Sequence, residues 1–480
     1  MSMGRRPSEQ QPELWIPTAD LPRSPGHVFY DKLNQLLHEV GFDRFAEDLC
    51  LKHYADGVGR ESIPPGVYFR MLFVGYFEGL DSQRAIAWRC ADSLSLRAFL
   101  GMPDNEATPD HSSLTKIRQR LPLDVHDQAF VFVLQVAQQK KLLRGKTVAV
   151  DSTTLEANAA MRSIVRKDTG EEYKEYLKRL LTEQGVENPT DEEVRRFDKD
   201  RKKKGSNQEW ESPVDPDSRI AKMKDKRTHL AYKAEHVVDL ESEFVVAAPV
   251  YTADQSDQST LVDSIWTAQI NLVLAGSEQE IEEAVADKGY HKAQTLADCE
   301  SCNTRTYIPE PKGRHYKSDD QPERQRAVKG NRRRIKGAKS KRLQRRRSEV
   351  VERSFAHICE TGGARRTWLR GLEKVAKRYA VQVAAHNLAL LMRKLFGIGK
   401  PRTLQGGADG LVSMVFWCNW LSTALNRRRH PPNCRRLAHM GLVAWRRPQQ
   451  QKWAIFNGLL YPCHSILSHL AGWSNKPLSL

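Results

Sequence analysis

Lys146–Asp151 reads Lys-Thr-Val-Ala-Val-Asp, a short run rich in β-branched residues that follows Gly145 and ends in a carboxylate. Such a run, bounded by turn residues, predicts a buried strand. A carboxylate at the carboxyl end of a buried strand lies at a sheet edge, where open α/β folds bind their ligands. We therefore expect Asp151 at a functional edge, with a simple turn or cap residue as the alternative.

Two later stretches carry further acids of the same kind. Residues 284–286 are Ala-Val-Ala and predict a short strand that ends in Asp287, with a turn at Lys288 and Gly289. In Glu349–Ile358, apolar residues at helical spacing predict a helix with Glu352 beside its apolar face. A helix packed on the sheet would point Glu352 at the strand ends, and three carboxylates would then meet.

Three adjacent carboxylates repel one another and raise each other's pKa unless cations neutralise them. Two divalent ions about 3.5–4 Å apart, clamping both sides of an in-line phosphoryl displacement, would relieve that repulsion. Hard oxygen ligands suit Mg²⁺, with Mn²⁺ as a substitute. The alternative is structural: Asp151 and Asp287 are turn formers, and Glu352 pairs with a neighbouring arginine on the surface.

These stretches resemble a known family. Asp151 in VAVDSTTLEAN, Asp287 in ADKGYH and Glu352 in RRRSEVVERSFAHI are similar to the three acids of bacterial insertion-sequence DDE transposases. IPPGVYFRMLFVGYFEGLDSQRAIAWRC resembles the helical N-terminal domain of one large branch of that family. The resemblance covers roughly residues 25–396. It implies an α/β fold with an RNase H-like mixed sheet flanked by helices, Mg²⁺ dependence, and cutting and joining of transposon ends.

The resemblance also implies roles for individual residues. Asp151 is expected to bridge two metal ions, Asp287 to hold one and Glu352 the other, while water and then a 3′-OH attack the phosphodiester. Residues expected at the scissile phosphate are Lys288, Tyr290, His291 and Arg353. Some relatives carry Tyr and Arg before the glutamate and Lys or Arg seven residues after it. This sequence has Arg345, Ser348 and Cys359 at those spacings, so the nearby Arg347, Arg365 and Arg366 are expected to substitute.

Composition limits the class of protein. The 480 residues suffice for two or three domains, and the net charge of +17 favours a polyanionic partner, double-stranded DNA first, over a merely basic protein. The eight scattered cysteines suit a reducing cytosol, and Cys299-x-x-Cys302 lacks the second pair that a zinc site needs. The N-terminus has no signal-peptide core, and Leu411–Leu425 is shorter than the ~20 residues of a membrane span. We expect a cytoplasmic, nucleoid-associated protein.

Four regions are expected along the chain. Residues 1–25 predict a disordered arm, and 26–142 predict an all-helical domain that contains either a DNA-reading helix-turn-helix or a plain bundle. Within it, Pro64-Pro65 opens one helix and Ser82 caps the next. Residues 143–398 predict the catalytic domain, with a charged helical insertion near 158–227 and a basic segment at 312–347. Residues 399–480 form a tail for which the sequence predicts no structure.

Inside the catalytic domain, Tyr232–Val250 predicts two antiparallel strands, Ser256–Leu274 a helix, and Leu372–Leu395 a long helix in which His386 is a packing residue. The basic segment is expected to follow DNA phosphates, so that affinity falls steeply with salt, unless it is only a solvated charge run. Its candidate DNA contacts are Arg332, Arg333, Arg334, Arg345, Arg346 and Arg347.

Three functions remain open on the sequence alone. The first is an active DDE transposase that works as a homo-oligomer on the two inverted-repeat ends of an insertion sequence. The second is a catalytically inactive relative that only binds DNA. The third is a metal-dependent nuclease that cuts without joining. The three acids favour the first over the second.

Overall fold

A computed structural model describes residues 26–55, 62–103, 105–201, 205–223, 227–311 and 321–401, which all belong to one compact unit. The expected arm at 1–25, the first part of the basic segment at 312–320, and all but the first three residues of the expected tail lie outside the described residues.

The N-terminal region is helical, as the sequence predicts. Its elements are α1 (Val28–Glu39), α2 (Phe42–Cys50), a 3₁₀ turn (Leu51–His53), α3 (Pro65–Glu78), α4 (Gln83–Ala91), α5 (Leu94–Phe99), α6 (His111–Arg120) and α7 (Leu123–Gln139). Ser82 caps α4 by accepting a hydrogen bond from the Ala85 amide, which confirms the predicted start of that helix. Helix α2 was not predicted from the sequence.

A mixed sheet follows, with β1 (Thr147–Glu156) at its centre. On one side β1 pairs antiparallel with β5 (Thr228–Asp239), and on the other it pairs parallel with β8 (Glu283–Val285), which pairs with β9 (Arg305–Tyr307). The remaining strands β4 (Arg219–Lys222), β6 (Val245–Ala247) and β7 (Val250–Thr252) pair with β5. Val148, Ala149 and Val150 are fully buried, so the predicted core strand is present, but it continues past its predicted end at Asp151 to Glu156.

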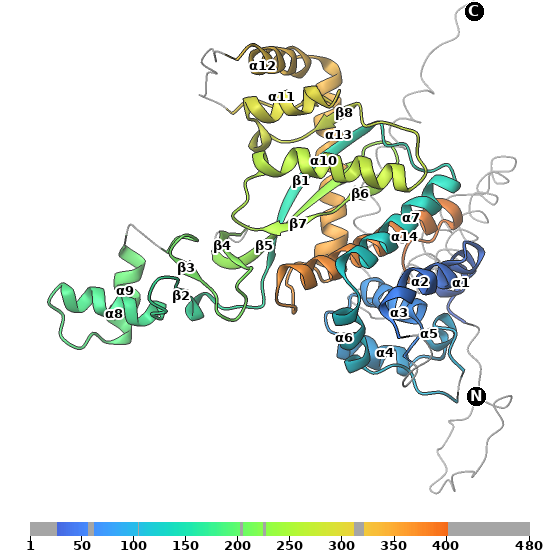
Figure 1. Ribbon diagram of the computed structural model, residues 1–480, viewed down its shortest axis with the longest axis horizontal. Helices are drawn as coiled ribbons and strands as arrows, with labels where there is room; N and C mark the ends of the chain where they lie inside the picture. Colours follow the sequence, from blue (N-terminus) through green and yellow to red (C-terminus); the bar gives the residue numbers. More distant parts are fainter. Residues whose placement is uncertain are drawn as a thin grey trace, which may run out of the picture. The chain divides into compact units, whose positions relative to one another are not determined.

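Helices cover both faces of this sheet (Figure 1). Successive residues of a strand point to opposite faces. Asp151 contacts Arg347 of α13 (Ala338–Phe355), whereas Ser152 contacts Asp257 of α10 (Asp257–Leu274). Thus α10 lies on one face and α13 on the other, where the long helix α14 (Leu372–Phe396) also packs.

The remaining helices lie near the β8–β9 edge or continue α13. They are a 3₁₀ turn (Lys288–Tyr290), α11 (Ala293–Ser301), α12 (Pro322–Ile335) and a π-helical segment (Ala356–Thr361). The described part of the basic segment is therefore two ordered helices, α12 and the start of α13, and not a solvated run. It folds because apolar residues such as Ala327 and Val328 bury one side of α12.

Helix α14 joins the helical region to the sheet. It packs against α3 and α7, and the His386 ring hydrogen-bonds the Tyr76 hydroxyl of α3 at 3.2 Å. His386 is 4% exposed, which agrees with the packing role predicted for it. The helices and the sheet share one hydrophobic core.

The chain between β1 and β4 forms the predicted charged insertion, which extends away from the sheet (Figure 1). It contains a 3₁₀ turn (Met161–Ser163), β2 (Val165–Arg166), α8 (Tyr173–Glu183), α9 (Asp191–Asp200) and β3 (Trp210–Glu211). Leu177, Leu181 and Val194 form a small core between α8 and α9 that is separate from the main one. The pairing of β2 with β3 was not predicted, because two-residue strands leave no periodic pattern.

A helical region followed by a mixed sheet with helices on both faces is the RNase H-like architecture that the family resemblance implies, and the predicted fold class is confirmed. Among the helices of the described residues, none combines the length and the apolar character that crossing a membrane requires.

Candidate active site

Asp151 and Asp287 lie at the same level on neighbouring strands. The parallel register pairs Ala149 of β1 with Val285 of β8, and each acid stands two residues further on. Strand β1 continues beside β5 to Glu156, so Asp151 lies within the strand and not at its end as predicted. The parallel pairing of β1 with β8 ends at Ala149 and Val285, so both acids follow the last paired residues and lie side by side there. Their charges interact, because the Asp287 carboxylate contributes to a raised pKa of Asp151.

The Asp151 carboxylate is largely buried and already has a cationic partner. Arg347 of α13 donates from Nη1 to Asp151 Oδ2 at 2.6 Å, and the Ser152 amide donates to Oδ1 at 2.9 Å. Burial raises the pKa of Asp151, while the Arg347 charge and the Ser152 amide oppose that rise. The guanidinium thus partly neutralises a carboxylate whose side chain is 27% exposed.

Asp287 lies at the start of a tight turn. Its Oδ1 accepts a hydrogen bond from the Gly289 amide at 2.7 Å. A Cβ atom at residue 289 would lie 2.9 Å from Asp287 Oδ1 and 3.1 Å from Asp257 Oδ2. A side chain at 289 would therefore displace one or both of these carboxylates, which converge on this turn.

Glu352 is placed differently from the two aspartates. It lies on α13 directly after the buried Val351, but its own side chain is exposed. Arg353 binds Glu243 at 2.9 Å and also Glu349, while Arg347 is on Asp151, so these arginines are engaged elsewhere. Within the residues that the structure describes, no three His, Cys, Asp or Glu side chains are grouped so as to hold a metal ion.

The aspartate pair nevertheless fits a divalent cation. Both side chains offer hard carboxylate oxygens, the ligands that Mg²⁺ and Mn²⁺ prefer. The Arg347 guanidinium lies at Asp151 Oδ2, where it stands in for a cation.

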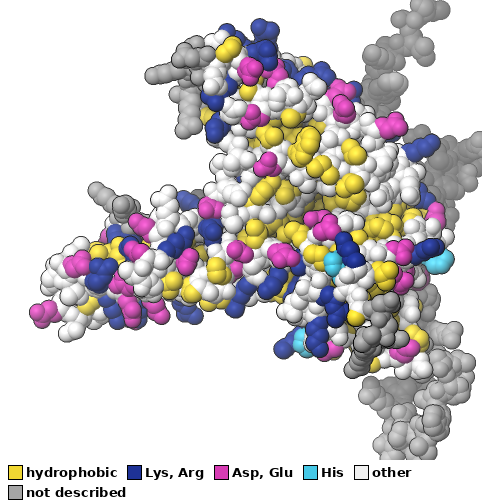
Figure 2. Space-filling view, viewed as in Figure 1, with side chains coloured by type: hydrophobic (Ala, Val, Ile, Leu, Met, Phe, Trp, Pro, Cys, Tyr) yellow, Lys and Arg dark blue, Asp and Glu magenta, His cyan; other side chains and the backbone are white. Residues whose placement is uncertain are grey.

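The basic side chains predicted to contact DNA fall into two groups. Those of Lys288, Arg333 and Arg345 are exposed. The others make intramolecular contacts: Arg332 with Glu310, Arg334 with Thr306, Arg346 and Arg353 with Glu243, Arg347 with Asp151, Arg365 with Glu360 and Thr153, and the exposed Arg366 with Glu156. Figure 2 shows Lys and Arg side chains next to Asp and Glu side chains both in the region of α12 and over the insertion.

Tyr290 and His291, which follow the Asp287 turn, both have side chains that are turned inward. Tyr290 is fully buried, and burial raises its pKa well above the ordinary value. Its hydroxyl therefore does not face DNA in this conformation, contrary to the contact expected from its position in the motif. His291 is partly buried, with Nε2 4.0 Å from Glu310, and burial lowers its pKa.

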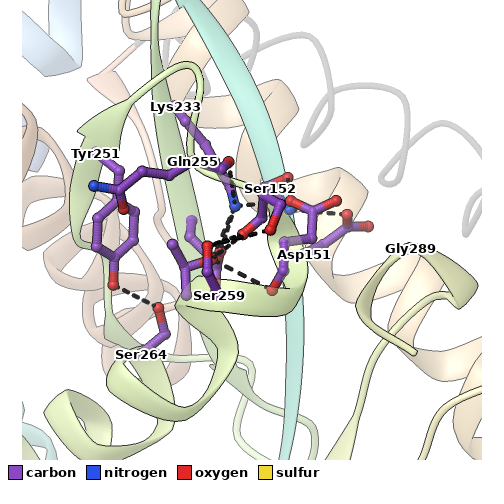
Figure 3. A network of polar contacts seen from close by, with 12 residues as sticks. Asp151, Ser152, Lys233, Tyr251, Gln255, Ser259, Ser264 and Gly289 are labelled. Carbon is purple, nitrogen blue, oxygen red and sulfur yellow. Dashed lines mark hydrogen bonds and ion pairs between the residues drawn. The ribbon is translucent and has the colours of Figure 1, made fainter. Parts of the chain in front are cut away.

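A network on the α10 face was not predicted from the sequence (Figure 3). Lys233 and Glu235 of β5 are buried side by side, and Lys233 also binds Asp257 at the start of α10. An open groove of about 580 Å³ borders the network, next to Ser152 and Gly289. The signal was present in β5: two oppositely charged residues stand at 233 and 235, and residues two apart in a strand share a face.

Comparison with known families agrees with this arrangement. Residues 19–120 match the family described as Transposase domain (DUF772), and residues 276–392 match the family described as Transposase DDE domain. The second match contains Asp287 and Glu352. No match to a curated protein was found.

A helical transposase domain followed by an RNase H-like DDE domain defines a DDE transposase. The chain belongs to the DDE transposases of insertion sequences, as its motifs indicate. Transposition, DNA as the partner and a divalent metal ion as the cofactor follow from that membership.

Proposed function

We propose that this transposase binds the inverted-repeat ends of its insertion sequence and cuts and joins DNA at a site formed by Asp151, Asp287 and Glu352. The observation that carries the proposal is the parallel β1–β8 register, which supports a shared edge for the two aspartates. Two Mg²⁺ ions, replaceable by Mn²⁺, are the proposed cofactors because all three proposed ligands are carboxylates.

The chain's own residues have distinct parts in the proposed reaction. Divalent ions bound here would activate the attacking oxygen and stabilise the leaving oxygen of an in-line displacement. Asp151 and Asp287 would hold them from two strands, which fixes the spacing of the acids. Arg347, once replaced at Asp151, would be free beside the site to contact the scissile phosphate.

Glu352 requires a movement of α13 in this proposal. Val351, one residue earlier, is buried toward the sheet, so a turn of the helix by one residue, about 100°, would bring Glu352 to that side. The π-helical segment Ala356–Thr361 directly follows α13, and such segments are frequent at functional sites. We propose that the register of α13 changes there when DNA and metal ions bind.

DNA would approach over the basic helices. The exposed Arg333 and Arg345 lie on α12 and α13, and Lys288 and Arg366 lie on the turns after β8 and α13. Phosphate contacts by these side chains would orient the duplex without reading its sequence. Because each element has two ends, we propose that the transposase acts as a homo-oligomer.

The test is metal-dependent cleavage of DNA that carries the ends of the element, with the full chain and its variants Asp151→Asn, Asp287→Asn and Glu352→Gln. Loss of charge stabilisation worth several kcal/mol predicts at least about a 10³-fold loss of cleavage with DNA binding retained. Glu349→Gln is the matched control, since Glu349 is an exposed acid on the same helix that pairs with Arg346 and Arg353. It should cut at close to the wild-type rate.

Other outcomes would contradict the proposal in specific ways. Wild-type protein that binds the ends and never cuts them with Mg²⁺ or Mn²⁺ is a DNA-binding relative. Cleavage without any joined product indicates a nuclease. If Glu352→Gln is as active as Glu349→Gln, the third acid is not Glu352.

A further inference from the structure

Lys233 is a buried ammonium group held by three side chains. Its Nζ lies 2.8 Å from Asp257 Oδ1 and 3.2 Å from Glu235 Oε2, and it donates to Thr260 Oγ1 at 2.8 Å. Lys233 is 4% exposed and Glu235 is fully buried. Burial raises the pKa of Glu235, while Lys233 opposes that rise.

Charges buried in this way are not needed to hold a sheet together. Apolar residues of similar volume stabilise a core as well as a buried ion pair does, or better. A buried ionic group beside a cleft is therefore a candidate for a role in the function of that cleft. What the group touches indicates the role.

The network contacts β1, which carries Asp151, and lies beside the turn that begins at Asp287. Ser152, which follows Asp151, donates from Oγ to Asp257 Oδ1 at 2.9 Å. The other oxygen of Asp257, Oδ2, faces Gly289 in the turn that begins at Asp287. Asp257 thus lies between the residue after one acid and the turn of the other; Figure 3 shows Ser152 and Gly289 on the two sides.

A second set of contacts connects the start of α10 to the turn after β8. Gln258 donates from Nε2 to the His291 carbonyl at 3.4 Å, and Thr295 donates from Oγ1 to the Gln258 carbonyl at 2.9 Å. The first turn of α10 is therefore joined both to β1 and to the segment that follows Asp287. Lys233 of β5 holds this turn in place through its ion pair with Asp257.

We propose that Lys233 and Asp257 are positioning residues that hold Asp151 and Asp287 at the separation required for metal binding. This inference rests on the proposed function, because it concerns the same two acids. Residues that orient metal ligands typically contribute 10–100-fold to metal affinity. Neither residue is required to touch DNA or a metal ion for this role.

A purely electrostatic role makes the opposite prediction for one of the two residues. If only charge mattered, Asp257→Asn would remove a negative charge and weaken cation binding, whereas Lys233→Met would remove a positive charge and strengthen it. If positioning matters, both substitutions weaken binding. The sign of the Lys233→Met effect separates the two explanations.

The experiment is a calorimetric titration of the full chain with Mn²⁺ in the absence of DNA. Asp257→Asn and Lys233→Met should each weaken Mn²⁺ binding about 10–100-fold. Asp263→Asn, an exposed acid on α10, and Lys222→Met, an exposed lysine on β4, are the matched controls and should leave binding unchanged. Asp257→Asn keeps the shape of the side chain, so it remains informative if Lys233→Met does not fold.

Hydrogen exchange of the metal-free chain gives a second readout. Both variants should speed exchange of the amides in 287–291, and the controls should not. Tighter Mn²⁺ binding by Lys233→Met, or unchanged binding and exchange in Asp257→Asn, would overturn the inference. Failure of the proposed function gives a different result, since Asp287→Asn would then bind Mn²⁺ as well as the wild type does.

Discussion

The two faces of the sheet around Asp151 hold buried charge in different ways. On the α10 face, Lys233 is enclosed by Glu235, Asp257 and Thr260, in a network that connects three elements of the fold. On the α13 face, Asp151 has one cationic partner, Arg347, whose side chain is 12% exposed, while that of Asp151 is 27% exposed.

This difference separates fixed from exchangeable parts of the site. Lys233 is buried, with only a small part of its surface reaching the adjoining groove, so its contacts keep the strands in place. Arg347 can leave Asp151 and be replaced by another cation, since the carboxylate is accessible. One face keeps the acids in position, and the other leaves Asp151 open to exchange.

The largest expected effect is on stability. Lys233→Met should reduce the free energy of unfolding by about 3–5 kcal/mol, because it leaves two acids without their buried partner. Arg347→Met should cost only about 1 kcal/mol, since water can reach Asp151. Urea unfolding of the two variants beside the wild type measures both values, and equal losses would remove the distinction between the faces.

A smaller effect is expected from pH, through His236 of β5. His236 is buried toward α13 and α14, where it hydrogen-bonds Ser354 and Tyr379, and burial lowers its pKa to about 3. The unfolded chain, with a histidine pKa near 6.5, takes up the proton first. The free energy of unfolding should therefore fall as the pH falls from about 6.5 toward 3, by up to about 1.4 kcal/mol per pH unit from this residue.

The measurement is urea unfolding at pH 7.5, 6.5, 5.5 and 4.5 for the wild type and His236→Gln. His126 and His386 are also buried with lowered pKa values, so only the difference between the two curves reports on His236. The variant should be less stable at pH 7.5 and lose less stability in acid. Parallel curves would show that His236 is not the source.

The smallest effect concerns metal affinity at Asp151. Arg347→Gln should tighten Mn²⁺ binding by up to about tenfold, since removing a competing charge beside the ligand is worth roughly 1.4 kcal/mol. Arg347→Lys, which keeps the charge, should change it less. Calorimetry without DNA checks this, and weaker binding by Arg347→Gln would mean that Arg347 supports the site rather than competing at it.

Much of the frame around the site follows from local patterns in the sequence. The β-branched run before Asp151 and the 25-residue helix α14 (Leu372–Phe396) have strong periodic or compositional signals. The serine cap of α4 and the antiparallel strands after residue 228 were likewise predicted with small errors in their bounds. These elements depend on residues close together in the chain.

The parts that were missed depend on contacts between distant residues. Nothing near Asp257 in the sequence indicates that it meets Ser152, more than a hundred residues earlier, or the Gly289 turn. The inward position of Tyr290 follows from packing behind the turn and not from its motif. The direction of the Glu352 side chain depends on the rotation of α13 about its own axis. The spacing of apolar residues predicts that rotation only to within about one residue.

The insertion has a consequence for how this catalytic domain can vary. Helices α8 and α9 form the end of a two-stranded ribbon, because β2 pairs with β3 beneath them, and they have a core of their own. Their loss or exchange would leave the pairing of β1 with β5 intact. The segment between Arg166 and Trp210 is thus where changes of sequence should disturb Asp151 least, as long as the packing of Tyr173 and Tyr176 on Trp210 is kept.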